Sequence, residues 1–171
     1  MHIDKLVNLE LEKKAEVDRL HYESFPKGRN ELKPECTYIF YNENSNLLGY
    51  CEIANPPIEN FCRFALRKPD YMITREELEL ADGLYLKYLT VAPQFRKQGF
   101  GKNIMYTSIN QARIDESNQG KLLTSSVTLI TEELEAQNYF IKQGFIRIKE
   151  VMDENYKTDE RIISAVLQRN V

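Results

Sequence analysis

Short apolar runs rich in β-branched and aromatic residues predict the strands of this chain. Residues 36–41 and 47–54 are two such runs separated by a polar turn, which predicts a β-hairpin. The clearest strand covers residues 84–91. Further strands are expected over residues 3–9, 122–130, 145–148 and 162–167.

Helical spacing of apolar residues marks a first helix over residues 10–24, which are rich in Glu, Lys and Arg and end before Pro26. The inner face of this helix is expected to consist of Leu11, Ala15, Val17 and Leu20. A short helix near 74–82 is indicated by the capping-box spacing of Thr74 and Glu77 and by the glycine that follows it.

A longer helix is expected after Gly101, because one stripe of a 3.6-residue period carries Ile104, Met105, Ser108, Ile109 and Ala112. Gly120 suits the residue just past its end. Thr131 is expected to cap a fourth helix that runs to about Gln143 and ends at Gly144.

The resulting order, β-α-β-β-(α)-β-α-β-α-β-β, predicts an α/β or α+β fold with a mixed sheet. The chain has 171 residues, which is the length of one domain with a sizeable core. We therefore expect a single domain over residues 1–171.

Composition narrows the classes of function. The formal net charge of −3 argues against general affinity for nucleic acid, which needs a basic surface. Asp4 and Asn8 interrupt any early apolar run, and no stretch reaches the roughly 18 apolar residues of a membrane span. Cys36, Cys51 and Cys62 show no CxxC spacing, so we expect free thiols in a reducing cytoplasm rather than disulfides or zinc ligands. Two histidines are too few for a histidine-based metal site.

A basic, glycine-containing loop joins the clearest strand to the helix that follows. It carries Arg96, Lys97 and Lys102 in an otherwise acidic chain. Gly99 and Gly101 remove Cβ atoms where ligand oxygens would approach, and the first helical turn offers unpaired N–H groups. The loop is therefore a candidate phosphate or pyrophosphate site. The alternative is that the glycines only shape a strand-to-helix turn. The segment matches neither the Walker signature nor the dinucleotide-binding signature, because it lacks one of the glycines that each signature requires.

Residues 89–101 read Leu-x-Val-x-Pro-x-x-Arg-x-x-Gly-x-Gly, and this segment resembles the acyl-CoA-binding loop of the GCN5-related N-acetyltransferase (GNAT) superfamily. The superfamily signature is Arg/Gln-x-x-Gly-x-Gly/Ala. A second segment, Ala-Gln-Asn-Tyr-Phe-Ile-Lys-Gln-Gly-Phe over residues 136–145, resembles the superfamily's next signature, Ala-x-x-Phe-Tyr-x-Lys-x-Gly-Phe. Two separate matches at the expected distance make the resemblance specific.

The resemblance implies a mixed, mostly antiparallel central sheet flanked by helices, with an insertion at about 58–83. It implies acetyl-CoA as cosubstrate, with the pyrophosphate held by loop amides and the pantetheine arm by the backbone of the preceding strand. The residues that it assigns to acetyl-CoA binding are Leu89, Thr90, Val91, Arg96, Lys97, Gln98, Gly99, Phe100, Gly101 and Lys102.

Departures from the family pattern fall on the residues that move protons. Phe140 stands where the family usually has the tyrosine that protonates the CoA thiolate, and Tyr139 is about 100° away round the helix. Glu133 stands where members often carry Asn. Tyr85 occupies the place of a frequent glutamate base, and Glu52 lies on a strand expected to neighbour it. We name Tyr85 and Glu52 as the candidate catalytic residues; the alternatives are a packed aromatic and a solvated strand-face charge.

The acceptor pocket of the family is built from its early helices and neighbouring loops, which here include Tyr22, Glu23, Phe25 and the 58–83 segment. His21 borders the same region and is a further candidate base; we expect the alternative, a surface histidine. Four acids could attract a cationic amine, or could be an ordinary solvated helix face: Glu76, Glu77, Glu79 and Asp82.

The resemblance implies direct transfer of an acetyl group from acetyl-CoA to a primary amine of a small molecule or peptide. An alternative is a CoA-binding regulator of the same fold with weak or no transfer. A third reading, an interaction module without a ligand, leaves the basic loop unused. The partners expected are acetyl-CoA and an amine acceptor, without nucleic acid or membrane, in a monomer or homodimer.

Overall fold

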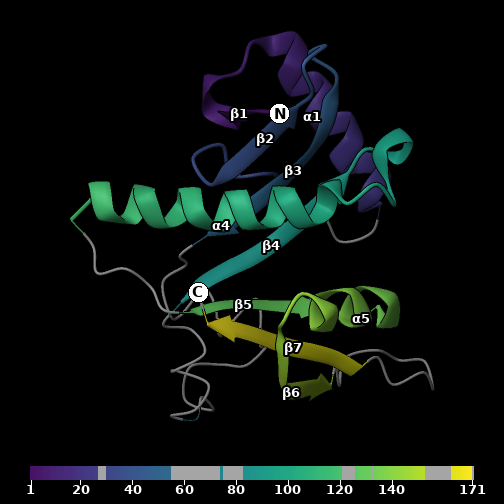
Figure 1. The fold of residues 1–171 in the computed structure, drawn as a ribbon, viewed down its shortest axis with the longest axis vertical. Coiled ribbons are helices and arrows are strands. Elements are labelled where there is room, and N and C mark those ends of the chain that lie inside the picture. Colours follow the sequence, from purple (N-terminus) through teal and green to yellow (C-terminus); the bar gives the residue numbers. More distant parts are fainter. Residues whose placement is uncertain are drawn as a thin grey trace. The chain divides into compact units, whose positions relative to one another are not determined.

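The computed structural model describes residues 1–26, 30–54, 74, 83–120, 126–131, 133–152 and 163–170. Its elements, shown in Figure 1, are β1 (His2–Lys5), η1 (Leu6–Asn8), α1 (Leu11–Ser24), β2 (Thr37–Tyr41), β3 (Leu47–Ala54), β4 (Leu84–Val91), η4 (Pro93–Phe95), α4 (Phe100–Asn118), β5 (Ser126–Thr131), α5 (Leu134–Lys142), β6 (Ile146–Met152) and β7 (Ile163–Asn170). The expected order of strands and helices is confirmed for these residues. The expected helix near 74–82 and most of the 58–83 segment lie outside them.

The sheet pairings confirm a mixed, mostly antiparallel fold with helices beside the sheet. β1 pairs with β2, β2 with β3, β5 with β7 and β6 with β7, all antiparallel, whereas β4 runs parallel to β5. By its internal contacts the chain forms two units. The first consists of Met1–Ala54 and Leu86–Leu122, and the second of Asn55–Tyr85 and Leu123–Val171. The single domain over 1–171 stays a prediction.

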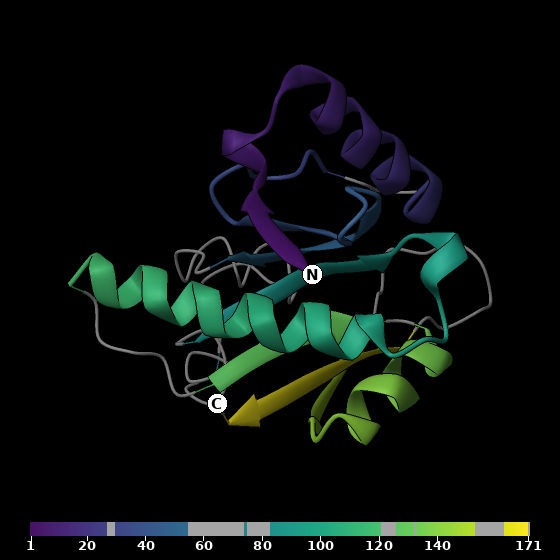
Figure 2. The ribbon, with the colours of Figure 1, turned by 45° about the horizontal axis from the view of Figure 1, so that its top comes forward.

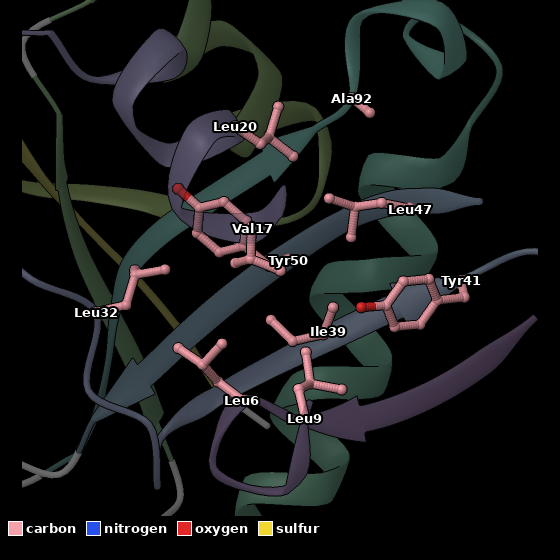
Figure 3. Close-up of a cluster of buried hydrophobic side chains, with 10 residues drawn as sticks. All are labelled: Leu6, Leu9, Val17, Leu20, Leu32, Ile39, Tyr41, Leu47, Tyr50 and Ala92. Carbon is pink, nitrogen blue, oxygen red and sulfur yellow. The ribbon is translucent and has the colours of Figure 1, made fainter. Parts of the chain in front are cut away.

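In the first unit, α1 and α4 cover opposite faces of the strands β1 to β3 (Figure 2). Between α1 and the sheet lies a hydrophobic core cluster, drawn in Figure 3, of Leu6, Leu9, Val17, Leu20, Leu32, Ile39, Tyr41, Leu47, Tyr50 and Ala92. On the other face, α4 packs against β3, which it crosses at an angle (Figure 1), and it buries all five residues of its expected stripe. The amphipathic pattern therefore predicted this helix correctly.

The inner face of α1 differs from the expectation. Leu11 is 85% exposed and Ala15 is exposed, whereas Val17, Leu20 and His21 are buried. A helix turns about 100° per residue, so Leu11 lies about 240° away from Val17 and Ala15 about 200° away. The buried residues instead follow the i, i+3, i+4 spacing of one helical face.

The start of the chain forms a strand only over β1 and continues as the 3₁₀ turn η1. Leu6 and Leu9 both enter the core cluster. Residues three apart would point to opposite faces of a strand, whereas one helical turn brings both to the same side. The expected strand over 3–9 is therefore wrong beyond Lys5.

In the second unit, β5, β7 and β6 form three adjacent strands, and the first two residues of β4 pair with β5, with Leu84 opposite Val127. The last helix starts later than expected: Thr131 is the final residue of β5, and Glu133 is the N-cap of α5. Gly144 follows this helix with φ 85°, and Gly120 follows α4 with φ 70°. Both glycines end their helices as expected, because this conformation is strained for other residues.

Candidate functional site

The loop between β4 and α4 is anchored to the core of the first unit. The Ala92 amide donates to the Leu48 carbonyl at 2.8 Å, which holds the end of β4 against β3. The single turn η4 follows, and the ring of Phe95 meets the edge of Phe100 with 6.0 Å between centroids. These contacts hold the backbone of the segment between β4 and α4 in place.

Two left-handed residues shape the end of this loop. Lys97 has φ 61° and Gly99, the N-cap of α4, has φ 84°. A Cβ built on Gly99 would meet nothing within 4 Å, so open space lies beside the helix start. Gly99 makes no side-chain cap, and the first turn of α4 contains no acidic residue. Its first amides and the positive end of the helix dipole therefore remain available to an anion.

The basic side chains of the loop differ in what they bind. The Arg96 Nε donates to the Val91 carbonyl at 3.0 Å, so this side chain bridges the loop to the end of β4. Lys97 is exposed, and Lys102 lies with its Nζ 5.9 Å from the ring centroid of Tyr106. The lysines are thus the side chains best placed to supply positive charge to a ligand, while Arg96 also fixes the loop.

The C-terminal end of β4 approaches β3 unusually closely. A Cβ on Gly49 would lie 2.1 Å from the Thr90 carbonyl oxygen, so only glycine fits there. Leu89 and Val91 are half-buried and Thr90 is buried. The strand and loop residues expected to bind acetyl-CoA thus lie consecutively in one unit, from Leu89 to Lys102.

His21 contradicts its expectation as a surface residue. It is 4% exposed and is hydrogen-bonded by both ring nitrogens, Nδ1 to the Tyr50 hydroxyl at 2.5 Å and Nε2 to the Asn30 carbonyl at 3.0 Å. Its ring packs against Phe25 and Tyr88, with centroids 5.4 and 4.7 Å away. The sequence signal that identifies it is its spacing from Val17 and Leu20, one helical face with two apolar residues.

Glu52 is not a solvated strand-face charge. It is 0% exposed, and each carboxylate oxygen accepts a hydrogen bond: Oε1 from the Lys87 ammonium at 3.2 Å and Oε2 from the Lys33 amide at 3.1 Å. The ammonium of Lys87 also lies 4.8 Å from the ring centroid of Tyr88. A carboxylate held by two donors is stabilised where it is, and accepting a proton would weaken both bonds.

The other candidate base, Tyr85, is half-buried near the start of β4, opposite Thr128 of β5.

Phe140, which stands where the family usually has its tyrosine, is 7% exposed. Its ring packs edge-on against Tyr139 and Phe145, with 5.2 and 5.5 Å between ring centroids. A phenyl ring in that place has no proton to give, and its packing is that of a core residue.

A nucleophilic cysteine is not favoured by the described thiols. Cys51 is fully buried, and burial raises the pKa of its thiol to about 12. Cys36 is half-buried and its pKa is raised by burial as well. Reactive cysteines need the opposite shift.

The acceptor region is described in part. Tyr22 and Glu23 are exposed, whereas Phe25 packs against the ring of Tyr88 at 4.9 Å. The acidic cluster of residues 76–82 lies outside the described residues. Within the part of the chain that the structure describes, no group of three or more metal-ligating side chains gathers, and no helix is long and apolar enough to cross a bilayer.

Solved structures share this fold across nearly the whole chain. Ard1 from Thermoplasma volcanium superposes with a TM-score of 0.62 and 17% identity, covering 99% of this chain and 97% of that one. A chain of the NatC complex bound to Gag peptide and CoA gives a TM-score of 0.63, 18% identity and coverage of 99% and 98%. Arabidopsis thaliana Naa50, in complex with the bisubstrate analogue CoA-Ac-MVNAL, gives a TM-score of 0.60 and 12% identity, covering 99% of this chain and 98% of that one. A sequence comparison with curated proteins gave no match.

The sequence model of the acetyltransferase (GNAT) family matches residues 3–145, which include β4, the loop after it and α5. This match spans most of the chain and agrees with the fold of the solved structures. The chain therefore belongs to the GNAT family of acetyltransferases, enzymes that take their acetyl group from acetyl-CoA.

Proposed function

We propose that this acetyltransferase transfers the acetyl group of acetyl-CoA to a primary amine of a peptide or small molecule. The observation that carries the proposal is the uncapped, acid-free start of α4 beside the left-handed Gly99. Such a helix start binds phosphate through its free amides and its dipole. Lys97 and Lys102 add charge of the sign that a pyrophosphate requires.

The transfer requires no covalent enzyme intermediate. The amine nitrogen attacks the thioester carbonyl, the N–C bond forms, the C–S bond breaks, and CoA leaves as a thiolate. A thiol of ordinary pKa near ~8.5 is a far easier leaving group than an alcohol. Hence a chain with Phe140 in place of the family's tyrosine can still release CoA without a proton donor at that position.

Binding of the amine in its neutral form is the harder requirement. An alkylamine with an ordinary pKa of about 10.4 is almost wholly protonated at pH 7, and a peptide amino terminus, with an ordinary pKa of about 7.7–8.0, is mostly protonated. A group or water chain must therefore remove a proton from either. Glu52 and Tyr85 stay our proposed bases from the sequence. Glu52 would have to loosen its bonds to Lys33 and Lys87 to act.

A peptide amino terminus is the acceptor to test first. Two neighbours were solved with peptide ligands, Gag peptide in the NatC complex and MVNAL in the bisubstrate analogue bound to Naa50. We include a reducing, cytoplasmic setting in the proposal, because Cys36 and Cys51 are free thiols. The alternative of a CoA-binding regulator without transfer is favoured by Phe140, which removes a proton donor.

The test is the thermal midpoint with acetyl-CoA or ATP, followed by CoA release with the peptide Met-Val-Asn-Ala-Leu or with spermidine. Acetyl-CoA at 100 times its Kd should add about 2.7 kcal/mol, a rise of about 5–11 °C for this chain length. ATP should add less. A rise with acetyl-CoA and CoA release with an amine supports the proposal; a rise without release favours the regulator; no rise at millimolar acetyl-CoA contradicts both.

Gly99→Ala and Gly120→Ala form a matched pair for this test. Both glycines have positive φ and open space for a Cβ, so alanine strains the backbone by about 1–2 kcal/mol at each. Only Gly99 lies at the proposed pyrophosphate site. We expect both variants to lower the midpoint of the free protein, and Gly99→Ala alone to lose most of the rise with acetyl-CoA. Equal rises in the two variants would show that the helix start does not bind the cosubstrate.

A further inference from the structure

We propose that His21 is the proton-holding end of a hydrogen-bonded chain that begins at Thr90, passes through Tyr50 and serves the proposed acetyl transfer. The inference rests on the proposed function. It makes this hydrogen-bonded chain, rather than Glu52 or Tyr85, the acceptor of the amine's proton. The sequence named Thr90 for its backbone and His21 as a residue beside the acceptor region, and it did not name Tyr50. Because His21 acts through the other two, it is a positioning residue.

The three side chains form one continuous path inside the first unit. The Thr90 hydroxyl donates to the Tyr50 hydroxyl at 3.3 Å, and the Tyr50 hydroxyl lies 2.5 Å from His21 Nδ1. Tyr50 is 0% exposed, His21 4% and Thr90 5%. The path connects the strand assigned to the cosubstrate with helix α1, which lie 69 positions apart in the sequence, from residue 21 to residue 90.

The second bond of His21 fixes its resting tautomer. Nε2 lies 3.0 Å from the Asn30 carbonyl oxygen, which can only accept, so Nε2 carries the hydrogen. In the neutral ring, Nδ1 then has a lone pair and accepts the hydrogen of the Tyr50 hydroxyl. That leaves the Tyr50 oxygen free to accept from Thr90, which agrees with the observed order of donors.

A protonated His21 satisfies the same contacts with the order reversed. Nδ1 then donates to Tyr50, Tyr50 donates to Thr90, and Thr90 donates outward. One proton taken up by the Thr90 oxygen from the attacking amine can therefore pass on in two short transfers, Thr90 to Tyr50 and Tyr50 to His21. No bond to the buried groups is lost, and the amine nitrogen keeps its electron pair for the thioester carbon.

Tyr50, the middle group of the chain, is suited to passing the proton on rather than to holding it. Burial raises the pKa of the Tyr50 phenol above its usual range, although the bond with Thr90 lowers it. The phenol therefore stays neutral and exchanges one hydrogen for another. Of the three side chains only the imidazole has a ring-nitrogen lone pair that can bind a further proton and leave both ring nitrogens as donors, so His21 is the member able to hold the proton.

The surroundings of His21 offer both an apolar wall and an exit. Phe25 and Tyr88 cover its ring, and the Tyr88 hydroxyl accepts from the Asn30 amide at 3.3 Å. His21 also lines a pocket of about 550 Å³ together with Leu6, Lys14, Asp18, Asn30, Glu31, Leu32 and Pro34. The charged groups that line this pocket with His21 are Lys14 and Asp18 from its own helix and Glu31 from the segment beside it. Glu52 on β3 is paired with Lys87 on β4. A proton held on His21 can return to solvent through this pocket between turnovers.

The experiment measures kcat against pH for acetylation of Met-Val-Asn-Ala-Leu at saturating acetyl-CoA, because kcat reports groups in the bound complex. His21→Gln keeps a polar side chain but cannot hold a proton, and we expect kcat to fall at least about 100-fold with loss of the acidic limb of the profile. Tyr50→Phe and Thr90→Val should have the same effect, since each removes one hydroxyl from the path. Thr90→Ser restores the hydroxyl and should restore the limb.

His2→Gln is the matched control, because His2 is the other histidine of the chain and is exposed beside Asp4. Its profile should equal that of the wild type. Each variant is first shown to keep the midpoint rise with acetyl-CoA, which separates a lost proton path from a lost fold. If His21→Gln and Thr90→Val keep the acidic limb and the wild-type kcat, the chain has no part in catalysis and the inference is wrong. If the wild type acetylates neither the peptide nor spermidine, the proposed function fails and the inference with it.

Discussion

The contact between Gly49 on β3 and the end of β4 gives a direct test of how the cosubstrate strand is positioned. Gly49→Ala would place a methyl carbon 2.1 Å from the Thr90 carbonyl oxygen, 3.0 Å from the Val91 Cα and 3.1 Å from the Ile104 Cδ1. Two of these three neighbours are backbone atoms, which cannot move aside by changing rotamer. The substitution must therefore separate the two strands.

The size of the effect follows from that distance. Ordinary van der Waals contact begins at 3.4 Å, so the Thr90 oxygen would have to retreat by about 1.3 Å from its 2.1 Å position. Overpacking a tight core costs about 1–3 kcal/mol. The displacement also strains the neighbouring bond from the Ala92 amide to the Leu48 carbonyl, and such a bond contributes about 1 kcal/mol. We expect a loss of about 3 kcal/mol and a midpoint lower by about 6–12 °C.

Thermal and urea unfolding of Gly49→Ala measure this loss, and Gly120→Ala is the control. Gly120 also loses a glycine, but a Cβ there meets nothing within 4 Å, so only backbone strain of about 1–2 kcal/mol applies. Because Thr90 and Val91 belong to the proposed cosubstrate site, Gly49→Ala should also weaken the midpoint rise with acetyl-CoA. A Gly49→Ala protein as stable as Gly120→Ala, with an unchanged rise, would refute the close approach of the strands.

Two further predictions concern ion pairs of the first unit. Lys87→Met leaves the buried Glu52 carboxylate without its cation and should lower the free energy of unfolding by about 3 kcal/mol, whereas the double variant with Glu52→Gln should recover part of that loss in urea unfolding. Partial burial raises the pKa of Asp115, but bonds from Lys5 and Tyr38 outweigh it and hold the pKa below its ordinary value of 3.8. A lowered pKa stabilises the fold above the unfolded value and ceases to do so as the pH falls through the folded one. Asp115→Asn should therefore destabilise at pH 7, and its difference from the wild type in urea unfolding should shrink below pH 3.8; a constant difference would contradict the assignment.

Elements with a strong local period were predictable from the sequence. The limits of β4 agree with the expected 84–91, and the apolar stripe of α4 is buried as expected. The loop after β4 was also predictable, since basic residues and glycines at a helix start indicate an anion site by local geometry alone. Short apolar runs were ambiguous: Leu6 and Leu9 fit a loose alternation, but their three-residue spacing belongs to the turn η1.

Polar residues inside the first unit could not be predicted, because their partners are far away in the sequence. From the sequence alone Glu52 resembles a solvated charge, because its partner Lys87 lies 35 positions later in the chain. His21 likewise resembles a surface residue, because its hydrogen-bond partners Tyr50 and Asn30 are not adjacent to it in the sequence. No local period encodes such pairs; they follow from strand order and from the side on which α1 packs.

The placement of these polar groups argues for a function beyond stability. A core gains most from apolar side chains, and each buried polar group must recover its lost hydration through hydrogen bonds. The core between α1 and the sheet nevertheless contains the imidazole of His21, the hydroxyls of Tyr50 and Thr90 and the carboxylate of Glu52, all buried. All four have hydrogen-bond partners: Tyr50 bonds to Thr90 of β4, Glu52 bonds to Lys87 of β4, and His21 bonds to Tyr50. Because β4 is the strand assigned to acetyl-CoA, the polar interior lies beside the proposed reaction rather than at random in the core. A fold selected only for stability has no reason to bring these groups to that strand.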